Sequence, residues 1–170
     1  LSTHADSGPA FTLNADYDAG DVIAIRAEGI VHLSPTWINN AAGILVEGSR
    51  NPGGWGVHDG HGYVWGALLL GSNNLGFHHV FPQTAEYGLG NGQPPSDISI
   101  VRSFGDLFGS GTTLSSGSAL EWRVYDWPAW TSDNTGAFVV SNFQMNTVPV
   151  PAALPMVCLL FAIISMPQGH

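Results

Sequence analysis

One segment of the sequence gathers oxygen-bearing side chains around a turn. It runs from Asp126 to Phe138 and reads DWPAWTSDNTGAF, with an adjacent Asp133 and Asn134 shortly before Gly136. A proline stops strand pairing, and Asp, Asn and Gly favour turns, so the segment predicts a loop between two strands. Such a loop can fold back and bring the side chains of Asp126, Asp133 and Asn134 together.

Calcium is the ion that suits this set of side chains. It takes about six to eight oxygen ligands from carboxylates, amides and backbone carbonyls in a flexible cage. Two carboxylates would neutralise the ion and the amide oxygen would fill a further position. Asp and Asn are also ordinary turn residues, so composition alone leaves a plain turn as the alternative.

The seven histidines raise the alternative of a zinc hydrolase. His58, Asp59 and His61 or the pair His78 and His79 could supply ligands and leave a position open for water. The HxxH spacing on a glycine-containing loop matches no catalytic signature, and the sequence has no GxSxG elbow, phosphate-binding loop or dinucleotide fingerprint. We therefore expect a protein that is not an enzyme.

Composition excludes several other classes. The 170 residues are 44% hydrophobic and only 10% charged, and four arginines and no lysine stand against 13 carboxylates, for a net charge of −9. A nucleic-acid binder needs a basic surface, so nucleic acid is not an expected partner. The single cysteine, Cys158, excludes an intrachain disulfide and cysteine-based zinc sites.

The elements that must position the loop read as short strands. Leu120, Trp122 and Val124 alternate with Glu121 and Arg123, which predicts a half-buried strand. Before residue 150 no window has a helical period, and residues 87–96 and 109–118 read as long surface loops. The pattern predicts an all-β chain, an antiparallel β-sandwich or barrel. The expected strands are 22–31, 63–70, 98–101, 120–126 and 137–145.

The loop resembles, without a gap, the calcium and sugar-binding loop of the PA-I galactophilic lectin family. Asp126 matches the first carboxylate ligand and Trp130 the residue that offers a backbone carbonyl. Asp133 and Asn134 match the adjacent pair of side-chain ligands, and residues 135–138 match the start of the following strand. The resemblance implies that Ca2+ is the bound cofactor.

A second match lies near the N-terminus. Residues 17–29 are similar to the first long strand of that family, which places Leu33 on the residue whose backbone carbonyl completes the calcium shell. Gly66, Ala67 and Leu68 match a further strand start. The resemblance implies that residues 1–146 form a jelly-roll-like, galactose-binding-domain-like sandwich, and that a homo-oligomer is possible.

The same resemblance implies a galactose-type ligand. The ion would keep positions open for two sugar hydroxyls, with Asp126, Asp133 and Asn134 hydrogen-bonded to the same hydroxyls. Trp127 would add an aromatic face, and His58 is the nearest substitute for a second contact loop that has no clear match. The expected partner is a galactose-containing glycan or exopolysaccharide, and calcium that only stiffens an extracellular-matrix protein is the alternative.

The C-terminal segment, residues 147–170, has a different composition. It contains no charged residue, and a proline-rich stretch precedes an apolar run of about fifteen residues, which is short of the ~20 that a spanning helix needs. The segment resembles PEP-CTERM sorting signals, although it ends in Pro167–His170 where that family has an arginine cluster. We therefore expect a short hydrophobic helix, export to the cell envelope or outer surface, and membrane contact only through this segment. The chain begins at Leu1 without an export leader, which suggests a mature form or a fragment.

Overall fold

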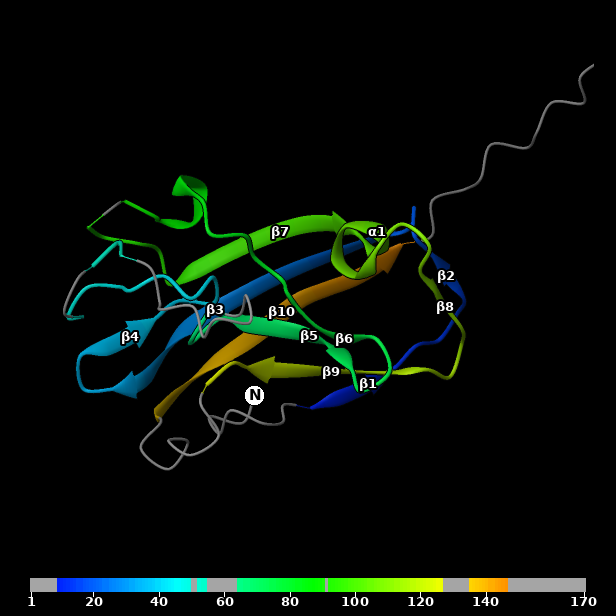
Figure 1. Cartoon of the computed structure of the whole chain (residues 1–170), viewed down its shortest axis with the longest axis horizontal. Helices are drawn as coiled ribbons and strands as arrows, with labels where there is room; N and C mark the ends of the chain where they lie inside the picture. Colours follow the sequence, from blue (N-terminus) through cyan, green and yellow to red (C-terminus); the bar gives the residue numbers. More distant parts are fainter. Residues whose placement is uncertain (1–8, 50–51, 55–63, 91, 127–134, 147–170) are drawn as a thin grey trace, which may run out of the picture.

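The computed structural model describes residues 9–49, 52–54, 64–90, 92–126 and 135–146, with only the backbone of 142–144. These residues form mostly antiparallel strands with little helix (Figure 1), so the prediction of an all-β chain is confirmed. One short α-helix, α1 (Phe104–Phe108), and one 3-10 turn, η1 (Ala85–Tyr87), interrupt them. The strands are β1 (Ala10–Thr12), β2 (Tyr17–Asp18), β3 (Val22–Ser34), β4 (Trp37–Asn39), β5 (Leu68–Ser72), β6 (Gly76–His79), β7 (Asp97–Ser103), β8 (Thr113–Leu114), β9 (Ala119–Val124) and β10 (Thr135–Asn146).

The described strands form two larger sheets and one small one. The first sheet has the order β1-β9-β5-β6, and a two-stranded sheet joins β2 to β8. In the second sheet β10 pairs along one side of β3, while β7 and β4 share the other side. Strand β3 is therefore the central strand of the second sheet, and its last residues lie between β4 and the start of β10.

Alternation of side chains explains how both sheets bury one face. In β3 the side chains of Ile23, Ile25 and Ala27 are buried, whereas those between them are half-buried. In β9 the buried side chains are Leu120, Trp122 and Val124, as the sequence predicted. Side chains from both sheets belong to a single hydrophobic cluster. Because neighbouring residues of a strand point to opposite faces, this period of two is what a shared core requires.

Four of the five expected strands match observed strands to within a few residues. The exception is the strand expected over 63–70, since β5 begins only at Leu68. Gly66 has φ +80°, a left-handed conformation that interrupts an extended chain, so the strand cannot start before it. The short elements were missed, namely β1, β2, β4, β6, β8, η1 and α1. Strand β8 lies inside the expected loop 109–118, and α1 is a helix of five residues begun by a capping box between Ser103 and Asp106.

A buried asparagine holds the loops on the β4 side of the fold. Asn40 is fully buried, and its amide nitrogen donates to the carbonyl oxygens of Tyr87 and Pro95, both at 3.0 Å. Its amide oxygen accepts the N–H groups of Ala42 and Ile44, both at 3.1 Å. Backbone groups therefore satisfy both the donor and the acceptor of this amide, as a buried polar side chain requires.

The helices of the described residues are short. None of them has both the length and the apolar character needed to cross a bilayer. Residues 147–170, where the sequence predicts a hydrophobic helix, lie outside the described part of the chain. The division of the chain at residue 146 stays a prediction.

Candidate functional site

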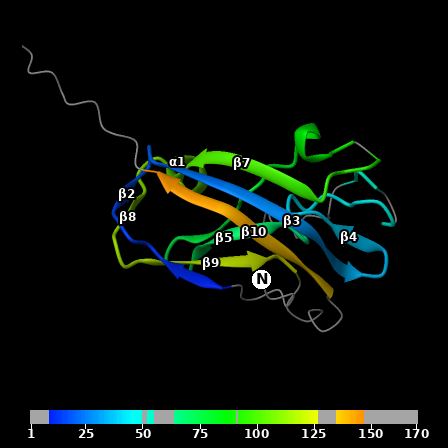
Figure 2. The same cartoon turned by 180° about the vertical axis from the view of Figure 1, so that it is seen from behind.

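The predicted calcium loop connects the two larger sheets. Residues 127–134 follow β9 of the first sheet and precede β10 of the second. Figures 1 and 2 show that β9 ends and β10 begins at the end of the molecule where β3 turns into β4. The structure therefore describes the residues that flank this connection, whereas Trp127, Trp130, Asp133, Asn134 and His58 lie outside the described residues.

Asp126 stands directly after the last paired residue on the first sheet. The N–H of Gly66 donates to the carbonyl oxygen of Tyr125 at 2.7 Å, and the N–H of Tyr125 donates to that of Ala67 at 3.0 Å. These bonds fix the backbone up to Tyr125. Asp126 itself is only 6% exposed. A carboxylate this buried requires favourable partners, and Asp126 has an interaction of this kind within the protein.

The other end of the loop meets the segment that carries Leu33. Thr135, the first residue of β10, pairs with His32, and Gly136 pairs with Val31. Directly opposite residues in an antiparallel pair have Cα atoms about 4.5–5.5 Å apart. The structure thus brings together two segments about a hundred residues apart in sequence, with Leu33 one residue beyond the last pair.

Leu33 lies at an irregularity in the pairing of β3 with β4. His32 pairs with Ile38 and Ser34 pairs with Trp37, so the register shifts across Leu33. At such irregularities a residue is left out of the regular ladder. The Leu33 side chain is 6% exposed and packs in the core, so a ligand role would fall to the backbone, as the resemblance implies.

Two tryptophans that the sequence reasoning missed connect these segments. The rings of Trp37 and Trp65 have centroids 5.5 Å apart and are tilted by 46°. Trp37 pairs with Ser34 beside Leu33, and Trp65 precedes Gly66, which binds Tyr125. No local pattern indicates this contact, because the two residues come together only through the pairing of distant strands.

His78 and His79 form hydrogen bonds with nearby backbone groups. Nε2 of His79 accepts the N–H of Val64 at 3.1 Å, and Nε2 of His78 lies 3.1 Å from the carbonyl oxygen of Leu75. The His78 ring also packs edge-on against Phe108. Within the described ranges no three His, Cys, Asp or Glu side chains cluster in a way that could hold a metal. The other histidines of the zinc hypothesis, His58 and His61, are not described.

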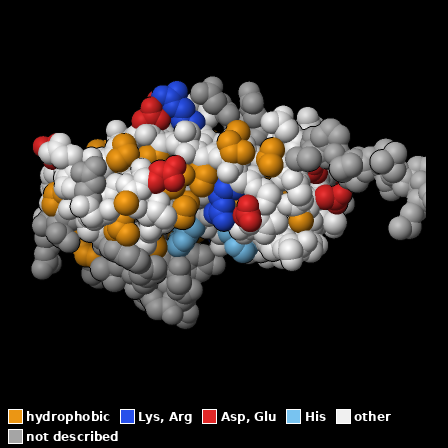
Figure 3. All heavy atoms as spheres, turned by 90° about the horizontal axis from the view of Figure 1, so that it is seen from above, with side chains coloured by type: hydrophobic (Ala, Val, Ile, Leu, Met, Phe, Trp, Pro, Cys, Tyr) orange, Lys and Arg blue, Asp and Glu red, His pale blue; other side chains and the backbone are white. Residues whose placement is uncertain are grey.

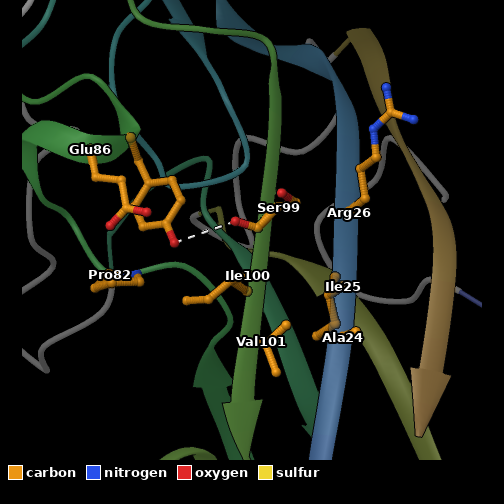
Figure 4. Close-up of a pocket in the computed structure, with 9 residues that line it drawn as sticks. Ala24, Ile25, Arg26, Pro82, Glu86, Ser99, Ile100 and Val101 are labelled. Atoms are coloured by element: carbon orange, nitrogen blue, oxygen red, sulfur yellow. Dashed lines mark hydrogen bonds between the residues drawn. The ribbon is translucent and has the colours of Figure 1, made fainter.

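A hollow of about 660 Å³ lies beside β7, away from the predicted calcium loop (Figure 4). The Tyr87 hydroxyl donates to the carbonyl oxygen of Ser99 at 3.4 Å, and burial raises the pKa of this phenol. Figure 4 shows Glu86 and Arg26 on opposite sides of β7. The residues that line the hollow are Ala24, Ile25, Arg26, Pro82, Glu86, Tyr87, Ser99, Ile100 and Val101.

The arginine at this hollow is paired with carboxylates of the protein. The Arg26 guanidinium binds Asp97 at 2.6 Å and Glu28 at 2.7 Å, and its hydrogen bond lowers the pKa of Asp97. On the face seen in Figure 3 each group of basic atoms lies next to acidic ones. This face therefore presents small mixed groups of charge and supplies no basic surface for a polyanion.

A scan against protein-family models and a search of curated proteins found no match to this chain. The resemblance to the galactophilic lectins consequently rests on the sequence motifs around Asp126 and Leu33.

Proposed function

We propose that this chain is a calcium-dependent carbohydrate-binding module with a galactose-type ligand and no enzymatic activity. The observation that carries the proposal is the pairing of Thr135 with His32, because it places the end of the Asp126 loop beside Leu33. Side-chain oxygens from one strand connection and a backbone oxygen from a distant strand can then share one focus. Mixed carboxylate, amide and carbonyl ligands are the set that calcium takes.

The proposed architecture is a sandwich of the two larger sheets, jelly-roll-like, with the loop at one end. The shared hydrophobic cluster of the two sheets supports it. Loops at the end of a rigid β scaffold are a usual place for binding residues. Asp126, Asp133 and Asn134 would supply side-chain ligands, and Leu33 and Trp130 would supply carbonyls.

Recognition in this proposal is by coordination and hydrogen bonding. When bound, the ion supplies open positions for two neighbouring hydroxyls of a sugar. Asp126, Asp133 and Asn134 accept or donate hydrogen bonds to those hydroxyls, which selects a sugar with the matching arrangement. Trp127 and His58 complete the expected sugar contacts. The ligand is a galactose-containing glycan or exopolysaccharide.

Substitution of Asp126 tests the site. Asp126→Asn keeps the size of the side chain but removes the charge, so calcium affinity should fall at least tenfold and calcium-dependent binding of methyl β-galactoside should be lost. Asp18→Asn is the matched control, because Asp18 is exposed and lies on β2, away from this loop. Calorimetric titration with calcium and then sugar measures both steps, and a chemical unfolding curve checks the fold. Calcium-dependent sugar binding that survives in Asp126→Asn would refute the site.

Asp133 offers a second test of the same ion. The related lectin loops carry Asn at this position, so Asp133 adds a negative charge and should hold calcium at least as firmly. Asp133→Asn should therefore weaken calcium binding in a direct titration. Tighter binding by the variant would contradict the role proposed for Asp133.

The proposal extends to location through residues 147–170. This segment would direct an exported protein to the cell envelope, with the hydrophobic stretch as a transient membrane anchor. Expression of the chain with and without residues 147–170 behind the same export leader, followed by fractionation, tests it. Equal recovery of both forms from the membrane fraction would contradict a sorting role.

A further inference from the structure

The contact between Trp37 and Trp65 spans the two described flanks of the proposed site. Trp37 pairs with Ser34, which follows Leu33. Trp65 precedes Gly66, whose N–H donates to the carbonyl oxygen of Tyr125, the residue before Asp126. Both indoles are half-buried, so each packs on the core and keeps part of its surface accessible. A partly exposed aromatic pair thus links the segment that is bonded to Tyr125 with β4, which pairs with β3 on the side opposite to the start of β10.

The backbone under these indoles is fixed by buried polar groups. The amide nitrogen of Asn39, a fully buried residue, donates to the carbonyl oxygens of Gly43 at 3.1 Å and Trp65 at 3.3 Å. Gly66 packs so closely on Asn39 that a Cβ there would approach its side chain to 2.6 Å. The Ser49 hydroxyl binds both the N–H and the carbonyl of Ile38, beside Trp37. A contact surface held in this way loses little conformational freedom when a ligand binds.

Stability alone gives a poor account of tryptophan at position 65. Its indole Nε1 is buried and has no hydrogen-bond partner in the described part of the chain. A buried Trp N–H usually finds a partner, and a phenylalanine would offer an aromatic face without an unpaired donor. Hydrogen bonding therefore does not explain why residue 65 is a tryptophan, which leaves the large flat surface of its indole as the property to explain.

We propose that Trp37 and Trp65 form a contact face for a second sugar unit, so that the ligand is an oligosaccharide. This inference rests on the proposed function, in which the calcium loop holds the first unit through its hydroxyls. The second unit would lay its apolar C–H face on the exposed part of the indoles. Aromatic side chains suit this role because they present a large, rigid and apolar surface.

Comparison of one-unit and two-unit ligands tests this face. The probes are methyl β-galactoside and a panel of galactose-terminated disaccharides that differ in linkage, each titrated with calcium present. The wild type should bind at least one disaccharide more tightly than the monosaccharide. Trp37→Leu should weaken that disaccharide about three- to tenfold and leave calcium and monosaccharide affinity within twofold. Trp65→Phe, a milder change, should weaken it less.

Phe108→Leu is the matched control, since Phe108 is a half-buried aromatic residue in α1 and packs on His78 and Phe104. This control should leave every affinity unchanged. If the wild type binds sugar and Trp37→Leu weakens neither ligand, or weakens both equally, the second-unit contact is wrong while the calcium site stands. If the wild type binds neither probe with calcium, the proposed function fails and this inference fails with it. Unfolding curves establish that both Trp variants are folded.

Discussion

Gly136 controls how the candidate loop joins the sheet, and its replacement by alanine should destabilise the protein. Its φ is +86°, and a Cβ at this position would lie 2.4 Å from the carbonyl oxygen of Ile30 in β3. A left-handed conformation costs an L-residue about 1–2 kcal/mol. The contact adds to this, because the oxygen belongs to a paired backbone that cannot rotate away. We expect Gly136→Ala to lower the free energy of unfolding by about 2–4 kcal/mol.

Two other glycines separate the two causes. Gly117 has φ +85°, close to that of Gly136, but a Cβ there would meet no atom within 4 Å, so Gly117→Ala should show the conformational cost alone. Gly20 has neither a positive φ nor a neighbour within 4 Å of such a Cβ, so Gly20→Ala should be neutral or slightly stabilising. Urea unfolding curves of the three variants measure the differences. A Gly136→Ala loss no larger than that of Gly117→Ala would refute a close approach between β10 and β3.

Two further substitutions test the buried amide and the surface ion pair. Asn40→Ala removes four hydrogen bonds to buried backbone and should lower the free energy of unfolding by about 2–5 kcal/mol, whereas Asn73→Ala, on an exposed turn, should have little effect in the same assay. A loss of unfolding free energy in Asn40→Ala no larger than that of the control would contradict the stabilising role of the Asn40 amide. Because Arg26 lowers the pKa of Asp97, this pair stabilises the protein above the unfolded-state pKa of Asp97 and the contribution is lost as pH falls through the lower folded-state pKa. The urea midpoint of unfolding should therefore fall less between pH 5 and about 2 in Asp97→Asn than in the wild type. Equal falls would show that the pair does not contribute to stability.

The strands that could be predicted from the sequence are those with a strong local signal. Alternation over 120–124 and the β-branched run from Val22 are properties of neighbouring residues, so they survive in any tertiary context. Strand β8 has two residues in a stretch rich in Gly and Ser, and it is defined only by pairing with β2. The five-residue helix α1 is too short to show a helical period. Such elements depend on contacts that a local pattern does not contain.

The candidate site divides in the same way. The strand that follows the Asp126 loop could be predicted, whereas the expected turn lies in residues 127–134, outside the described part of the chain, and stays a prediction. The pairing of Thr135 with His32 brings the residue after the loop close to the segment of Leu33, and the proximity of Leu33 to the loop itself stays a prediction. The contact of Trp37 with Trp65 could not be predicted, since it depends on the shift of register across Leu33 and on the bond between Gly66 and Tyr125. Long-range register decides which aromatic residues meet.

Several departures from regular structure lie near the connection between β9 and β10, and others occur elsewhere in the described residues. Gly136 and Gly66 have positive φ, the register of β3 and β4 shifts at Leu33, and Trp65 keeps a buried N–H without a partner among the described residues. Glycine takes a positive φ without steric strain, whereas the unpaired N–H of Trp65 costs stability. A spacer domain and a binding module make different predictions for these residues. The two roles differ in one measurable way: in a spacer Trp65→Phe would change only stability, whereas in a binding module it would also weaken a calcium-dependent glycan complex.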